Sequence, residues 1–290
     1  MQPTYAATPT EVLDDPDVIE LSVAASTDYF AWTANSEARR RRFNAYVRPI
    51  GGGDAVRVNP RHTLSYFIGI DGSMVVYSVA RRGNEDLALY DAATEGRPSL
   101  PEGVNTKAPE TRPSLSGDWL LFTKFLRNGK GKIVLFNIAT RERRVLRTSG
   151  GLLQSDQVNG DWATFEHCRD IHGDFANCDT FRYQISTEEL VKIPNPGKQQ
   201  YGGGVSDDGT VYIVRGGGSR VWRCGHNARI IRYPVGGPGV VISKMADGKD
   251  VFITYATDET GGATTLYLTR IACRTGRQGI YSIAKADTAT

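Results

Sequence analysis

The residue types best suited to chemistry are concentrated in one polar stretch, residues 167–179. It contains two cysteines, Cys168 and Cys178, and its other potential ligands are His167, Asp170, His172 and Asp174. Zinc accepts nitrogen, sulfur and carboxylate oxygen, so one interpretation is a metal site assembled from these residues. The alternative is a long loop closed by a Cys168–Cys178 disulfide, in which the histidines are solvated. The spacing matches no zinc signature, so we expect the disulfide and no metal.

Two more cysteines, Cys224 and Cys273, bring the total to four, an even number without a Cys-x-x-Cys pair. This usage favours disulfides and an oxidising compartment over zinc. In the repeated units described below, both cysteines are expected near the end of a third strand, on the face opposite the Cys168 loop. We therefore expect 224–273 as the second bridge, which requires Cα atoms within about 7 Å.

The expected location is secreted or cell envelope. The first ten residues have no basic start and no apolar stretch, so they contain no signal peptide. A secreted protein whose leader had been removed would begin in the same way. No apolar run approaches the length of about 18 residues that a membrane-spanning helix needs, so membrane insertion is not expected.

Motifs that mark common active sites are missing from the sequence. Gly-x-Ser-x-Gly, His-Glu-x-x-His and the Walker phosphate-binding pattern do not occur. A serine-hydrolase elbow, a helix-borne zinc and a P-loop therefore have no support. The isolated His62 and His226 are expected to be structural or solvated. Catalytic residues stay unassigned, and no cofactor is expected.

The elements that must position all these residues follow a repeat. Six times, a small polar turn opens into an apolar run rich in Tyr, Trp, Phe and Val. Counted at Asp28, Ser73, Asp118, Asp161, Thr210 and Asp250, the turns are spaced by 45, 45, 43, 49 and 40 residues. Each unit has segments typical of four strands, and glycine and proline interrupt every long helical pattern. The sequence thus predicts an all-β, six-bladed β-propeller with four antiparallel strands per blade and adjacent chain ends.

A single closed domain is expected over residues 17–290, because the chain is 40% hydrophobic and six such units fit one ring. The last unit is expected to have its own final strand at 279–284. Residues 1–16 then form an N-terminal extension, which either lies across the seam between the first and last blades or forms an outer strand there.

The repeat resembles that of the TolB-type six-bladed propeller family, whose blades carry a Ser-Pro-Asp-Gly-like turn and later a Tyr-x-x-Asp-like strand. Asp-Gly survives at Asp71–Gly72, Asp208–Gly209 and Asp247–Gly248, while the proline is missing from every copy. The second element is represented by 89–94. The resemblance covers residues 17–286 and implies the fold rather than a function. TolB has an additional α/β domain that this sequence does not match, so its partners are not carried over.

Charge is distributed unevenly among the predicted loops, although 35 basic and 32 acidic residues give a net charge of only +3. This balance argues against a nucleic-acid binder. The loops between the second and third strands of blades one to three, 34–42, 80–86 and 124–132, carry +3, 0 and +4, which is +7 in all. Loops of this kind share one face with the connections between blades, and we call it the long-loop face. The candidate ligand-binding residues on it are Arg39, Arg40, Arg41, Arg42, Arg81, Arg82, Lys124, Arg127 and Lys130.

The corresponding loops of blades four and six are expected to be acidic, the latter through Asp258 and Glu259. A lopsided field of this kind steers charged partners, whereas ordinary solvated loops would need no partner. Our first hypothesis is a non-catalytic, monomeric binding module that holds a protein or an anionic polysaccharide at the long-loop face. The alternative is a propeller enzyme of the lactonase, lyase or glycoside hydrolase type, with dispersed active-site residues at the tunnel mouth. Two carboxylates, or a histidine and a carboxylate, converging there would favour the enzyme.

Overall fold

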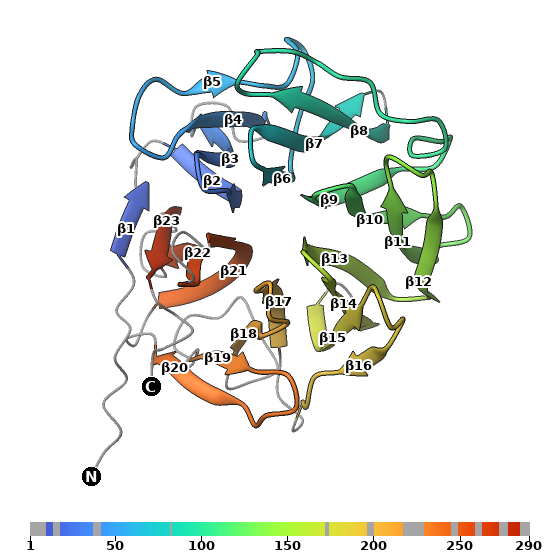
Figure 1. The fold of residues 1–290 in the computed structure, drawn as a ribbon, viewed down its shortest axis with the longest axis vertical. Coiled ribbons are helices and arrows are strands. Elements are labelled where there is room, and N and C mark those ends of the chain that lie inside the picture. Colours follow the sequence, from blue (N-terminus) through green and yellow to red (C-terminus); the bar gives the residue numbers. More distant parts are fainter. Residues whose placement is uncertain are drawn as a thin grey trace.

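The computed structural model describes residues 10–13, 18–36, 42–81, 83–171, 174–195, 200–216, 229–244, 249–258, 263–272 and 278–284. These residues form 23 strands in six antiparallel sheets and contain no α-helix. The sheets stand around a central axis like the blades of a propeller (Figure 1). The predicted six-bladed β-propeller is therefore confirmed. No helix in the described part of the chain is long and apolar enough to cross a membrane.

The strands follow one another from the centre of the ring outward. Blade one has β2 (Val18–Ala25), β3 (Tyr29–Ser36), β4 (Asn44–Pro49) and β5 (Val56–Arg57). Blade two has β6 (Ile68–Asp71), β7 (Met74–Arg81) and β8 (Asn84–Asp91). Blade three has β9 (Glu110–Ser116), β10 (Trp119–Phe125), β11 (Gly131–Asn137) and β12 (Arg143–Ser149). Blade four has β13 (Leu152–Asn159), β14 (Trp162–Ile171), β15 (Asp174–Gln184) and β16 (Leu190–Lys192). Blade five has β17 (Gln200–Val205), β18 (Val211–Arg215), β19 (Arg229–Tyr233) and β20 (Val240–Lys244).

Blade six is built from both ends of the chain. Its strands β21 (Lys249–Asp258), β22 (Thr265–Ala272) and β23 (Gln278–Ile283) come from the C-terminal part, and the outer strand is β1 (Thr10–Leu13). β1 pairs antiparallel with β23, with Thr10 opposite Ser282 and Leu13 opposite Ile280. Figure 1 shows β1 beside β23 at the junction between blades six and one. Residues 10–13 thus form an outer strand at the seam.

This closure corrects the expected register of blade six. The small polar turn before Asp250 precedes the inner strand β21 and does not join the first strand to the second. The strand expected to end the unit, 279–284, is the third strand of the sheet because the N-terminus supplies the fourth. Asp258 therefore ends an inner strand and does not belong to a loop between second and third strands. Glu259 lies outside the described residues.

Blade two has three strands rather than the four that most blades contain. After β8, Asp91 pairs with Gly96 in a single bridge, and residues 97–109 continue without a strand. This segment includes Pro98, Pro101 and Pro109, and proline has no backbone N–H for a ladder. Arg97 secures it instead, because Nη1 donates to the carbonyl of Val58 at 2.5 Å and to Tyr77 Oη at 3.0 Å.

The hydrophobic core lies between the blades. Six buried apolar clusters are present among the described residues, and each combines side chains of two neighbouring blades. Between blades two and three, for example, Val76 and Leu89 pack with Leu120 and Phe122. The strand alternation that the sequence shows therefore buries both faces of a blade, each against a different neighbour.

The inner strands are bulged near the middle. The pairing register shifts in β2, β9, β13, β17 and β21, which leaves extra residues without a direct partner on the second strand. Buried hydroxyl groups on the second strands bond the backbone at or near these bulges, and they belong to Thr33, Thr123 and Thr164. Thr33 Oγ1, for instance, accepts from the N–H of Ser22 at 3.1 Å and donates to the Tyr66 carbonyl of the next blade at 3.0 Å. In blade two, the Ser78 hydroxyl accepts from the N–H groups of Tyr66 and Phe67 before β6. A bulge redirects side chains toward the tunnel, and the hydroxyls satisfy the backbone that it frees.

Replacing Leu13 by Asp should destabilise the fold by about 1–3 kcal/mol, because a charge would enter an apolar cluster. Leu13 packs against the cluster that joins blades six and one and includes Phe30 and Ile280. Thr10→Asp is the matched control, since Thr10 lies on the same strand and is exposed. Chemical denaturation measures both variants, and equal stabilities would contradict a closing role for β1.

Candidate functional site

The described candidate residues of the long-loop face are exposed, with one exception. Arg42, Arg81, Arg127 and Lys130 are exposed in or beside loops that join second to third strands. Arg39, Arg40, Arg41 and Arg82 lie outside the described residues. Because all inner strands run in the same direction, these loops and the inter-blade connections meet at one end of the tunnel.

Lys124 is the exception, because its charge is neutralised within the fold. Its Nζ lies 3.1 Å from Glu110 Oε1 and donates to Thr106 Oγ1 at 2.6 Å. The side chain of Glu110 is fully buried, and that of Lys124 is 11% exposed. The strands bring this pair together, because Lys124 on β10 is directly opposite Glu110 on β9. A buried carboxylate needs such partners, so Lys124 has a structural role and is not an open cation.

A pocket of 550 Å³ opens beside this ion pair on the long-loop face. It is lined by Thr106, Lys107, Ala108, Leu126 and Arg127. Lys107 and Arg127 are exposed, and neither forms an ion pair with any described acid. Lys107 lies in the connection from blade two to blade three, which has no counterpart in the repeated turns, so sequence reasoning could not single it out.

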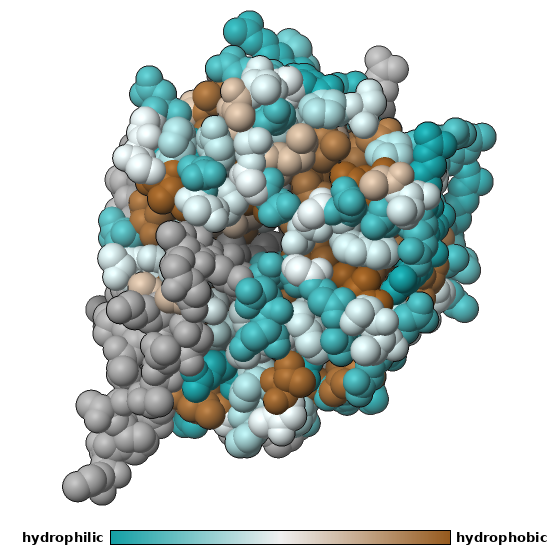
Figure 2. Space-filling view, in the orientation of Figure 1, coloured by the Kyte–Doolittle hydropathy of each residue, from teal (hydrophilic) through white to brown (hydrophobic). Residues whose placement is uncertain are grey.

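The opposite end of the tunnel has a smaller pocket of 210 Å³, lined by turns between first and second strands of four blades. Its polar groups are used to join one turn to the next. Ser26 Oγ donates to the Gly72 carbonyl at 2.7 Å, and Asp71 Oδ2 accepts from the Gly117 N–H at 2.7 Å. These bonds explain the recurring small polar residues as inter-blade contacts. Figure 2 shows a small hollow near the centre of the ring, with polar residues along part of its rim.

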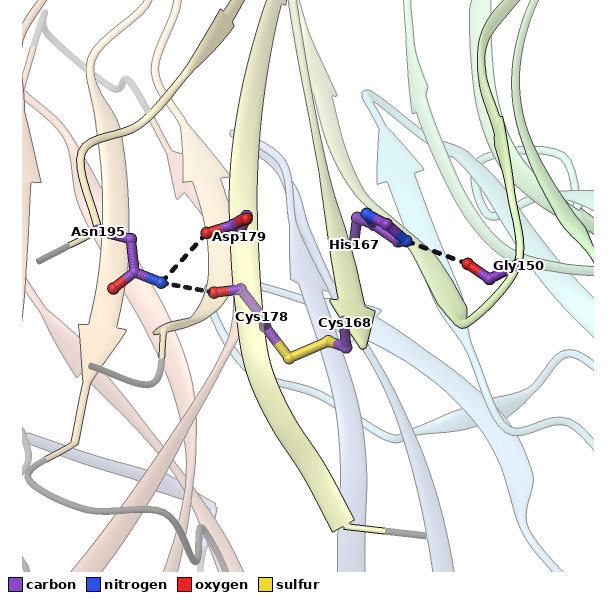
Figure 3. The surroundings of a disulfide bond; sticks show 6 residues. All are labelled: Gly150, His167, Cys168, Cys178, Asp179 and Asn195. Carbon is purple, nitrogen blue, oxygen red and sulfur yellow. Dashed lines mark hydrogen bonds between the residues drawn. A yellow bond between two sulfur atoms is a disulfide. The ribbon is translucent and has the colours of Figure 1, made fainter. Parts of the chain in front are cut away.

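The predicted Cys168–Cys178 disulfide is present, with Cα atoms 3.9 Å apart. The two cysteines face each other across β14 and β15, which extend through the expected loop as a long hairpin. Around it, Asn195 Nδ2 donates to the Cys178 carbonyl at 2.9 Å and to Asp179 Oδ1 at 3.2 Å (Figure 3). The stretch is therefore a cross-linked hairpin rather than a loop. Cysteines joined in a disulfide have no thiolate with which to bind a metal.

His167 is held by structural hydrogen bonds. Its Nε2 lies 3.0 Å from the Gly150 carbonyl and 3.1 Å from Ser149 Oγ, while Arg147 Nη2 lies 3.3 Å from Nδ1 (Figure 3 shows the contact with Gly150). The described residues contain no group of three potential metal ligands. The side chains of Asp170, His172 and Asp174 lie outside the description, as do Cys224 and Cys273. In chain order, the last two fall between β18 and β19 and between β22 and β23, not near the ends of third strands.

Two buried carboxyl groups beside the tunnel were not anticipated. Asp156 belongs to the bulge of the inner strand β13, and Glu166 lies on β14. They are 3% and 4% exposed, and Asp156 Oδ2 and Glu166 Oε1 have no hydrogen-bond partner among the described residues. Blade five faces them with glycine: a Cβ on Gly203 would lie 2.6 Å from Asp156 Oδ2. The polar residues within a predicted strand, Ser155–Gln157, were the available signal.

Burial governs the protonation of this pair. It raises the pKa of Glu166 from 4.5 to about 7, against the positive charge of Arg112 and a hydrogen bond from the Gly202 N–H, which lower it. Burial also raises the pKa of Asp156, and the neighbouring Glu166 charge adds to this increase. A carboxyl group that is removed from water favours the neutral acid, and here burial outweighs the opposing charge of Arg112. The pair is therefore able to hold a proton near neutral pH.

Arg112 connects this pair to blade two. It sits in the bulge of β9 with a φ of 52°, and its guanidinium lies 4.3 Å from the centre of the Phe67 ring. Its charge also acts on Glu85, although burial dominates there and raises the pKa of that carboxyl group. Positive φ at a non-glycine residue is strained and is frequent at functional sites. Three carboxyl groups from blades two and four thus lie within electrostatic reach of one arginine on blade three, which is the kind of dispersed arrangement that motifs cannot reveal.

Comparison with known proteins identifies the fold but no family. The chain matches no protein-family model and no curated protein. Among solved structures, a putative TolB from Agrobacterium tumefaciens is 14% identical with a TM-score of 0.56, and the match covers 94% of this chain and 90% of that one. TolB from Acinetobacter baumannii is 14% identical with a TM-score of 0.53, over 92% and 63% of the two chains. An oligogalacturonate lyase in complex with manganese is 12% identical with a TM-score of 0.53, over 94% and 83%. At such identities the likeness extends to the six-bladed propeller alone.

Stability should fall as the pH rises from about 4.5 to 7. An acid with a raised folded pKa keeps its proton in the native state while the unfolded chain loses it, so Glu166 stabilises the fold at low pH and loses this contribution as pH rises through about 7. The slope approaches about 1.4 kcal/mol per pH unit for one group. The lowered pKa values of Asp91, Asp161 and Asp208 act in the opposite direction, but at lower pH. Urea unfolding across this range measures the slope.

Glu166→Gln should reduce that slope, because the amide resembles the neutral acid and does not titrate. Glu102→Gln, at an exposed position, is the matched control and should leave the slope unchanged. An identical pH dependence in wild type and Glu166→Gln would contradict a proton held by the buried pair.

Proposed function

We propose that this protein is a non-catalytic binding module that holds an anionic partner at its long-loop face. The observation that carries the proposal is the set of cations on this face that make no ion pair with a described acid: Arg42, Arg81, Lys107, Arg127 and Lys130. Lys107 and Arg127 also line a pocket that a ligand group can enter. Similar charges concentrated at one face attract an anion and repel one another until it binds.

The proposed location is outside the cytoplasm, in the cell envelope or secreted. The Cys168–Cys178 disulfide supports this, because such bridges persist in oxidising compartments. A protein or an anionic polysaccharide would meet the long-loop face there.

Retention on a heparin column at low and moderate salt tests the proposal. Arg127→Ser with Lys130→Ser removes two charges from the loop before β11, and Arg141→Asn with Arg143→Ser removes two at the other end of that strand, from the turn and from the start of β12. Asn is chosen at position 141 because Arg141 has a φ of 64°. The first variant should elute earlier than wild type, and the difference should shrink with salt, since screening acts over about 8 Å near physiological ionic strength. Equal retention of both variants would contradict the proposal.

A propeller enzyme is the second candidate, and the buried Asp156–Glu166 pair beside Arg112 favours it. Groups with strongly perturbed protonation cluster at active sites, and an oligogalacturonate lyase shares the fold. Turnover of a polyuronate, a glycoside or a lactone, abolished by Glu166→Gln and retained by Glu102→Gln, would establish this candidate. Absence of turnover on all three substrate classes would remove its support.

A further inference from the structure

We propose that the pocket at Lys107 and Arg127 receives a short acidic peptide segment of a partner protein. A carboxylate of the peptide would lie between the two cations, and an adjacent apolar side chain would rest on Ala108 and Leu126. This inference rests on the proposed function and specifies the chemistry of its partner.

The two cations belong to two separate segments near blade three, and both line the same pocket. Lys107 belongs to the connection from blade two, and Arg127 belongs to the loop between β10 and β11. Both are exposed. The charge of the nearby Lys124 is already matched by Glu110 at 3.1 Å. The pocket therefore presents two unmatched positive charges, which suit one or two carboxylates.

Hydrogen bonds within the protein fix both segments that line the pocket. Glu110 accepts hydrogen bonds from the Thr106 N–H at 3.1 Å and the Thr106 hydroxyl at 2.7 Å, and Thr106 Oγ1 accepts from the Ala108 N–H at 3.1 Å. In the other segment, the Leu126 N–H donates to the Lys130 carbonyl at 2.8 Å. Backbone that is already fixed loses little entropy on binding, so a small pocket can give useful affinity.

The floor favours a peptide over a polysaccharide. Ala108 and Leu126 are partly exposed apolar residues that line the pocket together with the two cations. A peptide offers aliphatic or aromatic side chains next to its carboxylates and would bury them here. A uronate polymer offers hydroxyl groups, which lose hydrogen bonds against apolar carbon. The volume of 550 Å³ is within the range of about 300–1,000 Å³ that is usual for small-ligand sites, so it accommodates a short segment rather than a long chain.

Fluorescence anisotropy with labelled, end-blocked peptides tests the inference. The probe is Gly-Leu-Glu-Leu-Asp-Gly, and its two controls replace the acids by Gln and Asn, or both leucines by Ser. The acidic leucine peptide should bind at least about ten-fold more tightly than its amide control at low salt. Lys107→Ser and Arg127→Ser should each raise its Kd about five-fold, the size expected for a partly exposed ion pair. Arg143→Ser, on the outer strand β12, should leave the Kd unchanged.

The apolar floor has its own variant. Leu126→Ala should weaken the leucine peptide and leave the serine peptide unaffected, so the cycle isolates the contact with the floor. The inference would be overturned if the acid and amide peptides bound equally well, or if neither Lys107→Ser nor Arg127→Ser changed the Kd. Heparin oligosaccharide bound through Lys107 and Arg127 in preference to the peptides would overturn it while leaving the proposed function intact. Failure of both the peptides and heparin to bind would overturn both.

Discussion

The structure depends on burial between blades. Each blade is a thin sheet with apolar side chains on both faces, and no face is covered within its own blade. The six buried clusters each need two neighbouring blades, so the ring must close before the last face is removed from water. The ring is closed by pairing between the two ends of the chain, because the N-terminal strand β1 completes the sheet that contains β23.

Close packing of blades at the centre of the ring creates the polar interior. The inner strands are crowded there, and their bulges leave backbone groups without ladder partners. Buried hydroxyls such as Thr123 Oγ1, which accepts from the Ser155 N–H at 2.7 Å, satisfy those groups. The same distortion places Asp156 and Arg112 where regular alternation would not put them. The perturbed carboxyl pair is thus a consequence of how the ring is closed at its axis, whether or not it has a catalytic use.

The long-loop face is less constrained, because its loops leave the sheets and need not pack against a neighbour. Cations can accumulate there without loss of stability, since surface substitutions usually change it by less than about 0.5 kcal/mol. Lys124 differs from the other cations, because it is largely buried and forms an ion pair with the fully buried Glu110. The other described cations of this face form no ion pair with a described acid, and this difference is the physical basis for assigning binding to Lys107 and Arg127 rather than to Lys124.

The sequence was sufficient for the architecture and the Cys168–Cys178 bridge, because turn spacing and local cysteine separation are properties of neighbouring residues. It did not reveal features that depend on distant pairing. Lys124 and Glu110 meet only across paired strands, and the Asp156–Glu166 environment depends on Gly203 of another blade. The register of blade six was misplaced by one strand because its fourth strand comes from the N-terminus. The prolines after β8 disfavour a fourth strand in blade two, but the regular repeat led us to expect four strands in every blade.

Lysine footprinting can show whether an anionic partner covers the long-loop face. Acetylation rates read by mass spectrometry, with and without polyglutamate as the anionic probe, report which amines the partner covers. We expect protection of Lys107 and Lys130, slow and unchanged reaction of the largely buried, paired Lys124, and an unchanged rate for Lys192 on the outer strand β16, which is 52% exposed and pairs with Asp179 at 2.8 Å. Protection of Lys192 in preference to Lys107, or no protection at Lys107 and Lys130, would contradict the assignment of the long-loop face as the binding surface.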